Sequence, residues 1–279
     1  MRESMSITLT LQTTSTVPLE AEVISPDRLA GLNQAEIAAL PVQHGNQKAA
    51  LGDFFRVTGA SNGEIRLEGD LSRVKLVGAG MSHGRMVIAG NVGMHVGAGM
   101  RGGEIVVEGD AGDWAGAEMS GGRLLVKGNA GHLIGSAYRG GTVGMQGGEI
   151  IVQGNAGNEV GAAMRRGLIA VGGNSGDFTG VNMLAGTIVV LGQLGWRSGA
   201  GMKRGSIISM RPAEILPTFT FACTYQPTFL PIFLRRLRDQ GFRWPGTRPL
   251  NWIWRCYPDR GNSLQEDLRW NWPGICRSA

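Results

Sequence analysis

Short apolar segments recur along the middle of the chain, and within them apolar side chains alternate with side chains of mixed polarity. The segments read EIRLE, RMVIA, EIVVE, RLLVK, EIIVQ, LIAVG and TIVVL, and glycine lies close to both ends of each. Runs of four to six residues with this pattern are typical of β-strands and are too short for ordinary helices. The pattern therefore predicts a succession of short strands separated by sharp turns.

These segments belong to a repeat whose units begin with glycine and are spaced by 21, 19, 19, 26, 19, 19 and 19 residues. Further glycines recur at offsets of six, nine and thirteen. The units begin at Gly63, Gly84, Gly103, Gly122, Gly148, Gly167, Gly186 and Gly205. Short sides joined by sharp turns predict a β-solenoid whose coils advance by about 4.8 Å. The glycines then mark corners, where the backbone needs positive φ or where adjacent coils approach closely.

Stacking of the coils predicts vertical columns of equivalent residues. One interior column is Ile65, Met86, Ile105, Leu124, Ile150, Ile169, Ile188 and Ile207, and another is Leu67, Ile88, Val107, Val126, Val152, Val171 and Val190. A third closes the units with Met81, Met100, Met119, Tyr138, Met164, Met183 and Met202. A polar column, predicted to be a stacked corner rather than an acid/base site, is Asp70, Asn91, Asp110, Asn129, Asn155, Asn174 and Gln193.

The segments outside the repeat divide the chain into four parts. Residues 1–62 are predicted to form an N-terminal cap, 63–211 the solenoid, 212–243 a C-terminal strand and helix, and 244–279 a flexible tail rich in tryptophan and arginine. In the cap, SITLTLQ and LGDFFRV read as strands, and Asn33 with Glu36 forms a capping box before a short helix that Pro41 stops. A helix over about 228–240 has Pro231 in its first turn. This helix either caps the column or docks a partner, and the tail is either an interface hook or disordered.

The net charge of +5 resides at the C-terminal end of the chain. Residues 1–234 hold 18 basic and 18 acidic side chains, whereas nine arginines between Arg235 and Arg277 face four acids. A neutral body with a basic tail does not indicate a nucleic-acid-binding protein.

A second group of cations lies within the repeat and is the candidate partner-docking surface. Arg101, Arg139, Arg165 and Lys203 are predicted to share one edge position, and Arg166 and Arg204 follow it; together they are the six ridge cations. One interpretation is an exposed ridge of salt bridges with Glu64, Glu104 and Glu149. The other is a cationic ridge that docks an acidic surface or an anionic cofactor tail.

The unit that begins at Gly122 carries seven extra residues between Ser136 and Gly148. An insertion in a solenoid becomes a loop on one face. We expect this loop to contact another molecule, although its glycine content also fits a loop that is merely longer than the others.

Candidate catalytic chemistry is sparse. Cys223, Cys256 and Cys276 are widely separated, and the four histidines share no column, so no metal site is expected. No nucleophile elbow or P-loop occurs. No apolar run approaches the length of about 18 residues that spans a membrane, and no signal peptide is recognised, so a cytoplasmic location without membrane contact is expected.

Two longer stretches resemble a known family. GNVGMHVGAGMRGGEIVVEGDAGDWAGAEMSGGRLLVKGNAGHLIGSAYRGG and GNEVGAAMRRGLIAVGGNSGDF closely resemble the C subunit of formylmethanofuran dehydrogenase and of the formyltransferase/hydrolase complex. PDRLAGLNQAEIAALPV and CTYQPTFLPIFLRRL extend the resemblance to roughly residues 5–243, whereas the segment from about 247 onward resembles nothing recognised. More distantly, the repeat resembles the C-terminal domain of the large subunit of glutamate synthase.

The resemblance implies an all-β chain, a right-handed parallel β-helix with a small α/β cap and a C-terminal helix. It also implies a non-catalytic structural subunit of an assembly in tetrahydromethanopterin- and methanofuran-dependent one-carbon metabolism. The chain itself would hold no cofactor; molybdopterin, iron-sulfur clusters or zinc would belong to partner subunits. The resemblance leaves open whether that assembly is the dehydrogenase or the formyltransferase/hydrolase. The alternatives are a stand-alone solenoid enzyme, a free-standing binding solenoid and a scaffold domain like that of glutamate synthase.

Overall fold

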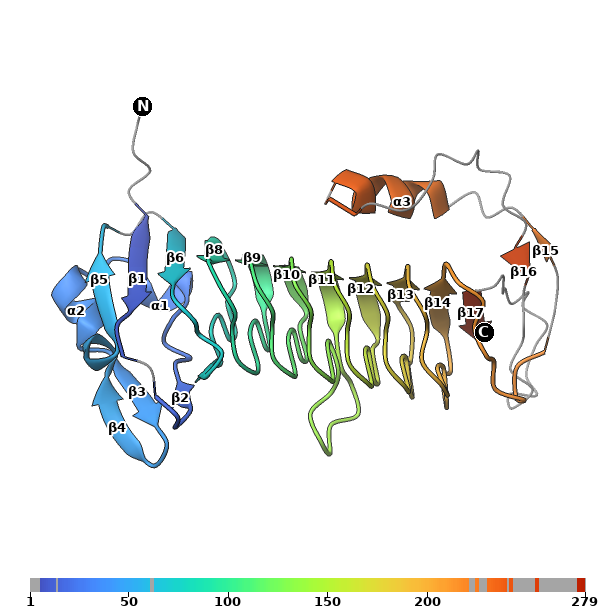
Figure 1. Ribbon diagram of the computed structural model, residues 1–279, viewed down its shortest axis with the longest axis horizontal. Helices are drawn as coiled ribbons and strands as arrows, with labels where there is room; N and C mark the ends of the chain where they lie inside the picture. The colour runs from blue at the N-terminus through green and yellow to red at the C-terminus, as the bar shows by residue number, and fades with distance from the viewer. Residues whose placement is uncertain are drawn as a thin grey trace.

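The computed structural model describes residues 6–13, 15–60, 63–220, 224–225, 230–239, 241–242, 254–255 and 275–278. The chain forms a long column of coils with a small cap at its N-terminal end, and one helix lies alongside the C-terminal coils (Figure 1). The column confirms the predicted β-solenoid.

One side of the column is a continuous parallel sheet to which each coil contributes one strand. These strands are β6 (Glu64–Glu68), β8 (Arg85–Ile88), β9 (Arg101–Val107), β10 (Gly121–Val126), β11 (Gln146–Val152), β12 (Arg166–Val171), β13 (Thr187–Val190) and β14 (Gly205–Ser209). Pairing sets Ile65 opposite Met86, Met86 opposite Ile105, and so on to Ile207. Both predicted apolar columns are buried in the interior, each side chain at most 2% exposed. On another side, one residue per coil forms a bridge to the next coil.

The third interior column consists of methionines throughout, which corrects one position. Met145 is fully buried and packs beneath Gly167 as Met119 packs beneath Gly148. Tyr138, predicted to close this coil, is only partly buried. The extra residues are therefore 138–144. They leave the column before the closing position, which Met145 occupies, and not after it.

The glycines serve the two predicted purposes at different offsets. At Gly116 φ is +63°, and an added Cβ would lie 2.5 Å from Ile150 Cδ1. At Gly128 φ is ordinary, but a Cβ would lie 2.7 Å from the Gly109 carbonyl oxygen of the preceding coil. Real Cβ atoms do not approach backbone so closely, so the stacking of the coils itself requires glycine at such positions.

From Asn91 onward, the predicted polar column forms a ladder between coils, whereas Asp70 accepts hydrogen bonds from Ser72 in its own turn. Each side-chain oxygen accepts a hydrogen bond from the backbone amide of the equivalent residue one coil further on, over 2.6–2.9 Å, from Asn91 through Asp110, Asn129 and Asn155 to Asn174. Sequence reasoning missed a second ladder, which joins Asp113, His132, Asn158, Asp177 and the amide of Trp196. Both ladders satisfy backbone amides at corners that a sheet cannot reach.

The N-terminal cap covers the first coil, as predicted. Strand β1 (Ile7–Leu11) pairs in parallel with β6 and antiparallel with β5 (Phe55–Thr58). The capping box of Asn33 and Glu36 is present at α2 (Gln34–Ala38). The remaining elements are β2 (Leu19–Glu20), α1 (Pro26–Leu29), β3 (Pro41–His44), β4 (Gln47–Ala50), the 3₁₀ turn Leu51–Asp53 and β7 (Val74–Lys75). Within the cap, β4, β3 and β2 form a small sheet that β7 of the first coil joins.

At the C-terminal end, helix α3 (Leu230–Asp239) covers the outer face of the sheet. Its Leu234 and Leu237 are buried in a cluster with Ile151, Ala170 and Val189, whose side chains point outward from the column. The helix therefore packs along a side of the column rather than over its end. Most of the predicted tail 244–279 lies outside the described residues. Two parts of it are described: β16 (Trp254–Arg255) pairs with β15 (Thr224–Tyr225), and β17 (Ile275–Ser278) pairs antiparallel with β14.

Candidate partner-docking surface

Five of the six ridge cations lie at the edge where the chain returns to the sheet. The amides of Arg101, Arg165 and Lys203 each donate to a carbonyl of the preceding coil, those of Met81, Met145 and Met183, over 2.8 Å. Arg166 and Arg204 follow directly, and all five side chains are exposed. The intervening coils place Ser120, Gln146 and Leu184 at this edge. The cations therefore form separate groups rather than an unbroken row.

Arg139 does not share this position, contrary to the prediction. It lies in the loop 138–144, which projects from one edge of the column between β10 and β11 (Figure 1). Gln146 takes the edge position of that coil, because its amide donates to the Met119 carbonyl. The cause is the register of the insertion, the same shift that replaces Tyr138 by Met145.

The salt-bridge interpretation of the ridge fails within the part of the chain that the structure describes, where none of the six cations forms an ion pair. The three glutamates predicted to pair with it belong to another column, in which charges alternate: Glu64, Arg85, Glu104, Arg123 and Glu149. Arg85 lies 3.2 Å from Glu104, and Arg236 of α3 lies 2.7 Å from Glu149.

Arg123 has an unusual position in this charge column. One nitrogen of its guanidinium, Nη1, lies 3.4 Å from Glu104. Its Nε and Nη2 are shielded from solvent and have no hydrogen-bond partner. Because Glu149 pairs with Arg236, the helix holds the carboxylate that would otherwise serve Arg123. The signal in the sequence that could have revealed this column is the alternation of Glu and Arg directly before the interior apolar column, at Glu64, Arg85, Glu104, Arg123 and Glu149.

An aromatic cluster anchors the inserted loop to the column. Tyr138 stacks on Trp114 with ring centroids 5.0 Å apart, and its hydroxyl lies 3.1 Å from His95 Nδ1. Its backbone amide donates to the Glu118 carboxylate. Burial, followed by the positive charge of Lys75, lowers the pKa of the His95 imidazole. Burial, assisted by Glu118, raises the pKa of the Tyr138 hydroxyl.

Asp27, Ser82 and His83 meet where the cap joins the first coil, but their geometry is not that of a catalytic triad. The Ser82 hydroxyl bonds to Asp27, and both groups lie 3.1 Å from the same ring nitrogen, His83 Nδ1. A triad needs the serine at one ring nitrogen and the acid at the other. The His83 side chain is also 62% exposed. The contact instead ties helix α1 to the solenoid.

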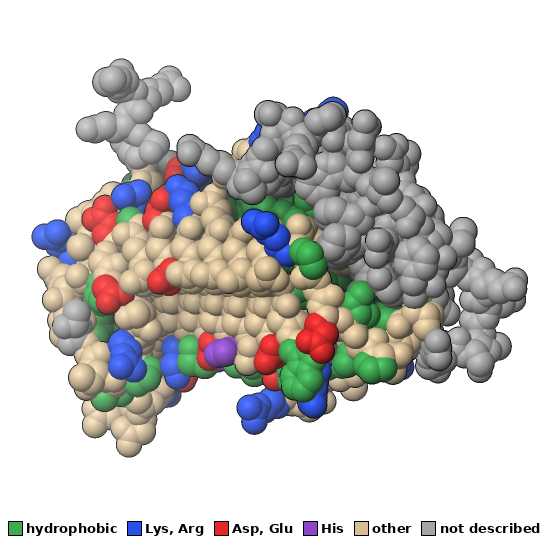
Figure 2. All heavy atoms as spheres, turned by 45° about the vertical axis from the view of Figure 1, so that its right-hand side comes forward, with side chains coloured by type: hydrophobic (Ala, Val, Ile, Leu, Met, Phe, Trp, Pro, Cys, Tyr) green, Lys and Arg blue, Asp and Glu red, His purple; other side chains and the backbone are tan. Residues whose placement is uncertain are grey.

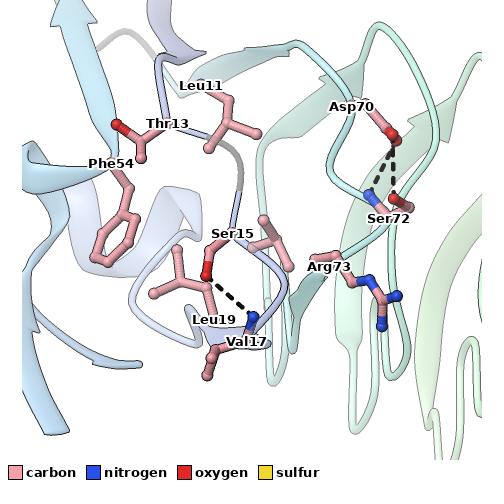
Figure 3. A pocket seen from close by; sticks show the side chains of 10 residues that line it. Leu11, Thr13, Ser15, Val17, Leu19, Phe54, Asp70, Ser72 and Arg73 are labelled. Carbon is pink, nitrogen blue, oxygen red and sulfur yellow. Dashed lines mark hydrogen bonds between the residues drawn. The ribbon is translucent and has the colours of Figure 1, made fainter. Parts of the chain in front are cut away.

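A pocket between the cap and the first coil is too small for a substrate. It encloses about 80 Å³ and is lined by Leu11, Ser15, Phe54, Asp70 and Arg73 among others (Figure 3). Binding sites for small molecules usually enclose about 300–1,000 Å³. Asp70 is engaged locally, because it accepts hydrogen bonds from the Ser72 amide and hydroxyl (Figure 3).

The described residues contain no group of three or more His, Cys, Asp or Glu side chains that would hold a metal ion. Across those same ranges, no helix is long and apolar enough to cross a membrane. One long face of the column carries few charged side chains, and charged and hydrophobic side chains gather along its lower border (Figure 2). Fold and surface together define the class of protein: a glycine-rich β-solenoid with exposed cations at one edge of its column.

Comparison with known proteins places this solenoid in a family. Residues 104–217 match the family model described as the GXGXG motif. A chain in the crystal structure of the formyltransferase/hydrolase complex from Methylorubrum extorquens in complex with methylofuran is 33% identical, with a TM-score of 0.82. The alignment covers 90% of this chain and 93% of that one. The protein belongs to the family that contains the C subunit of formylmethanofuran dehydrogenase and the matching subunit of the formyltransferase/hydrolase complex.

Curated relatives match over shorter segments. The C subunit of the molybdenum-containing formylmethanofuran dehydrogenase 1 from Methanothermobacter marburgensis is 45% identical over 82 residues, which are 29% of this chain and 20% of that protein. The C subunit of the tungsten-containing formylmethanofuran dehydrogenase 2 from Methanothermobacter thermautotrophicus is 43% identical over 95 residues, 32% of this chain and 35% of that protein. The chain thus spans about a fifth to a third of the length of these curated relatives.

Proposed function

We propose that this chain is a non-catalytic structural subunit of a cytoplasmic complex of the formylmethanofuran dehydrogenase or formyltransferase/hydrolase type. The complex would act in one-carbon metabolism that depends on tetrahydromethanopterin and methanofuran. The observation that carries the proposal is the structural match over nine-tenths of both chains to a component of such a complex. Zinc, molybdopterin or iron-sulfur clusters belong, in this proposal, to the other subunits.

The geometry of the chain supports a structural role. Its buried side chains form stacked apolar columns, and its ordered polar side chains mainly hold one coil to the next. The candidate chemical groups, Asp27, Ser82 and His83, tie two parts of the fold together. What the described surface offers is unpaired cations at one edge, which suit an acidic partner subunit.

Reconstitution tests this proposal. The partner subunits encoded in the same organism are expressed with and without this chain, and turnover of formylmethanofuran is measured for each preparation and for the chain alone. We expect the chain to co-purify with those subunits and to show no turnover alone. Turnover by the isolated chain, or failure to join any such complex, would refute the proposal. Dependence on an electron acceptor in the complete complex would distinguish the dehydrogenase from the hydrolase.

A further inference from the structure

Outside the sheet, a regular set of backbone hydrogen bonds joins each coil to the next. In each of the first six coils, three amides donate to carbonyls of the following coil over 2.7–3.2 Å. The equivalent amides of the seventh coil find no acceptor among the residues that the structure describes. They are those of Leu194, Arg197 and Gly201, and we call the backbone of these three residues the open rung.

The two sides of the column end at different levels. On the sheet side, β14 pairs with β13 of the seventh coil, and β17 pairs with β14 (Figure 1). The sheet thus continues for two strands, or about 10 Å, beyond the coil that carries the open rung. At the N-terminal end, by contrast, the cap covers both sides of the first coil, because β1 pairs with β6 and β2 pairs with β7.

The interior of the last coil is closed even though its backbone is not. Phe219 is only 6% exposed, and a Cβ on Gly199 would lie 3.1 Å from its ring. The groups left over at this end are therefore polar backbone groups outside the core. Beside them the Trp196 ring is 54% exposed, one of three large apolar side chains with such exposure in the described part of the chain.

The open rung has the hydrogen-bonding pattern of an unpaired strand edge. One coil earlier, the Ser175 amide donates to the Gln193 carbonyl, and the Ser175 carbonyl accepts from the Gly195 amide. This is a parallel bridge, and Leu194 is the equivalent residue with its own N–H and C=O left over. Such a residue is a template for an extended backbone, and solenoids need a cap where their coils end.

The charge at this end argues against a second copy of the chain as the cap. Residues 186–209 contain three Lys or Arg and no Asp or Glu. Arg197 itself belongs to the open rung, and its guanidinium lies 4.5 Å from the centre of the Trp196 ring. Asp177, one coil earlier, is held by the Trp196 amide. Two copies that met here would bring like charges together, which is unfavourable.

We propose that the open rung pairs with an extended segment of a partner subunit, which adds one strand to this corner of the column. Backbone carbonyls of the segment accept from the amides of Leu194 and Arg197, and one of its amides donates to the Leu194 carbonyl. An apolar side chain of the segment packs on Trp196, and the segment has no cation there. Main-chain hydrogen bonds supply the affinity in this mode of recognition. The inference rests on the proposed function in one respect, that the partner is another subunit of the complex.

Amide hydrogen exchange read by mass spectrometry tests the pairing. The full-length chain is labelled alone and after saturation with the subcomplex of the remaining subunits, expressed without it. We expect the amides of Leu194 and Arg197 to exchange rapidly in the free chain and at least about 100-fold more slowly in the complex. The equivalent amides of Ser175 and Phe178 already donate to the seventh coil and should exchange slowly in both samples.

Variants of Trp196 test the side-chain contact. Trp196→Lys places at the open rung a residue that natural edge strands use against pairing, and it should weaken binding of the subcomplex by about tenfold or more. Trp196→Phe should retain most of the affinity. Ile232→Lys is the matched control, because it introduces the same charge at a 70% exposed apolar residue of α3. It should bind like the wild type.

The outcomes separate this inference from the proposed function. A complex that forms without slower exchange at Leu194 and Arg197 would overturn the inference and leave the proposed function standing, as would equal losses in Trp196→Lys and Ile232→Lys. Slow exchange in the isolated chain would also overturn it: at every concentration, the chain covers its own rung, and at high concentration only, a second copy does.

A wild-type chain that binds no subcomplex would overturn the proposed function and the inference with it. Thermal unfolding of each variant checks the fold. If Trp196→Lys does not fold, the exchange of the wild-type amides decides.

Discussion

Two glycines with the same backbone conformation provide a sharp test of how the coils are packed. Gly99 and Gly116 both have φ of +63°, so alanine suffers the same backbone strain at each. A Cβ on Gly99 meets no atom within 4 Å, whereas a Cβ on Gly116 lies 2.5 Å from Ile150 Cδ1 and 3.1 Å from Ile150 Cγ1. Ile150 is fully buried, so its side chain has little room to move.

These contacts determine the expected magnitudes. Left-handed strain costs about 1–2 kcal/mol for each alanine. Overpacking against a fixed core side chain adds about 1–3 kcal/mol, so Gly116→Ala should exceed Gly99→Ala by about that amount. The Gly99 position accepts side chains elsewhere, because Glu118, Ala163 and Asn182 occupy it in other coils with φ of 52–56°.

The assay is equilibrium unfolding in urea, followed by two spectroscopic probes because repeat proteins do not always unfold in one step. The free energies of unfolding of the two variants are compared, provided that both free energies fall with urea concentration at the same slope. In a thermal melt the same difference corresponds to about 2–4 °C per kcal/mol. Equal destabilisation of the two variants, or a larger loss at Gly99, would refute the stacking of Ile150 against the corner at Gly116.

Three further predictions concern polar contacts. Asp27→Asn should reduce stability at neutral pH, and by a smaller amount as the pH falls below 3.8, as measured by thermal unfolding. Burial opposes ionisation of Asp27, but hydrogen bonds from Ser82 and the charge of His83 outweigh burial and lower the pKa of the Asp27 carboxyl. The contribution of Asp27 to stability is therefore present above the usual pKa of 3.8 and is lost as the pH falls through the lowered pKa. His95→Gln should reduce the loss of stability between pH 7.5 and 5. The lowered pKa of His95 favours the neutral imidazole in the folded state, so protonation below pH 6.5 favours unfolding. If the thermal unfolding midpoint of the variant changes with pH as steeply as that of the wild type, the prediction is wrong. In the second ladder, His132→Asn should be nearly neutral and His132→Leu should cost about 1 kcal/mol in urea unfolding, because only the former can accept the hydrogen bond from the Asn158 amide; equal losses would show that the ladder contributes nothing at this coil.

The repeat was predictable because its period brings chemically matched residues together. Spacing alone indicated that Ile105 lies over Met86 and beneath Leu124, and the pairing of the strands confirms this. The polar ladder followed from the same spacing. The hydrogen-bond partners within the ladder could not be predicted, because the sequence does not distinguish an asparagine that accepts from the next coil from one that accepts within its own turn.

The errors arose where the period is interrupted. A coil with seven extra residues can be aligned with the repeat in two ways, with either Tyr138 or Met145 at the closing position. The methionine seven places beyond Tyr138 was the signal for the correct alignment, because the other coils close with methionine. Assigning Tyr138 to the interior also misplaced Arg139 in the ridge. The pairing of Glu149 with Arg236 joins the fifth coil to a helix 87 positions later in the chain, a contact that no local pattern encodes.

The most direct test of the account is native mass spectrometry of the complex that a tagged copy of this chain retains when it is expressed at its natural level. We expect a stable hetero-oligomer in which this chain is bound to the subunits that carry the formyl-transferring chemistry. Recovery of the chain by itself, or only as copies of itself, would contradict the conclusion that it is a structural subunit.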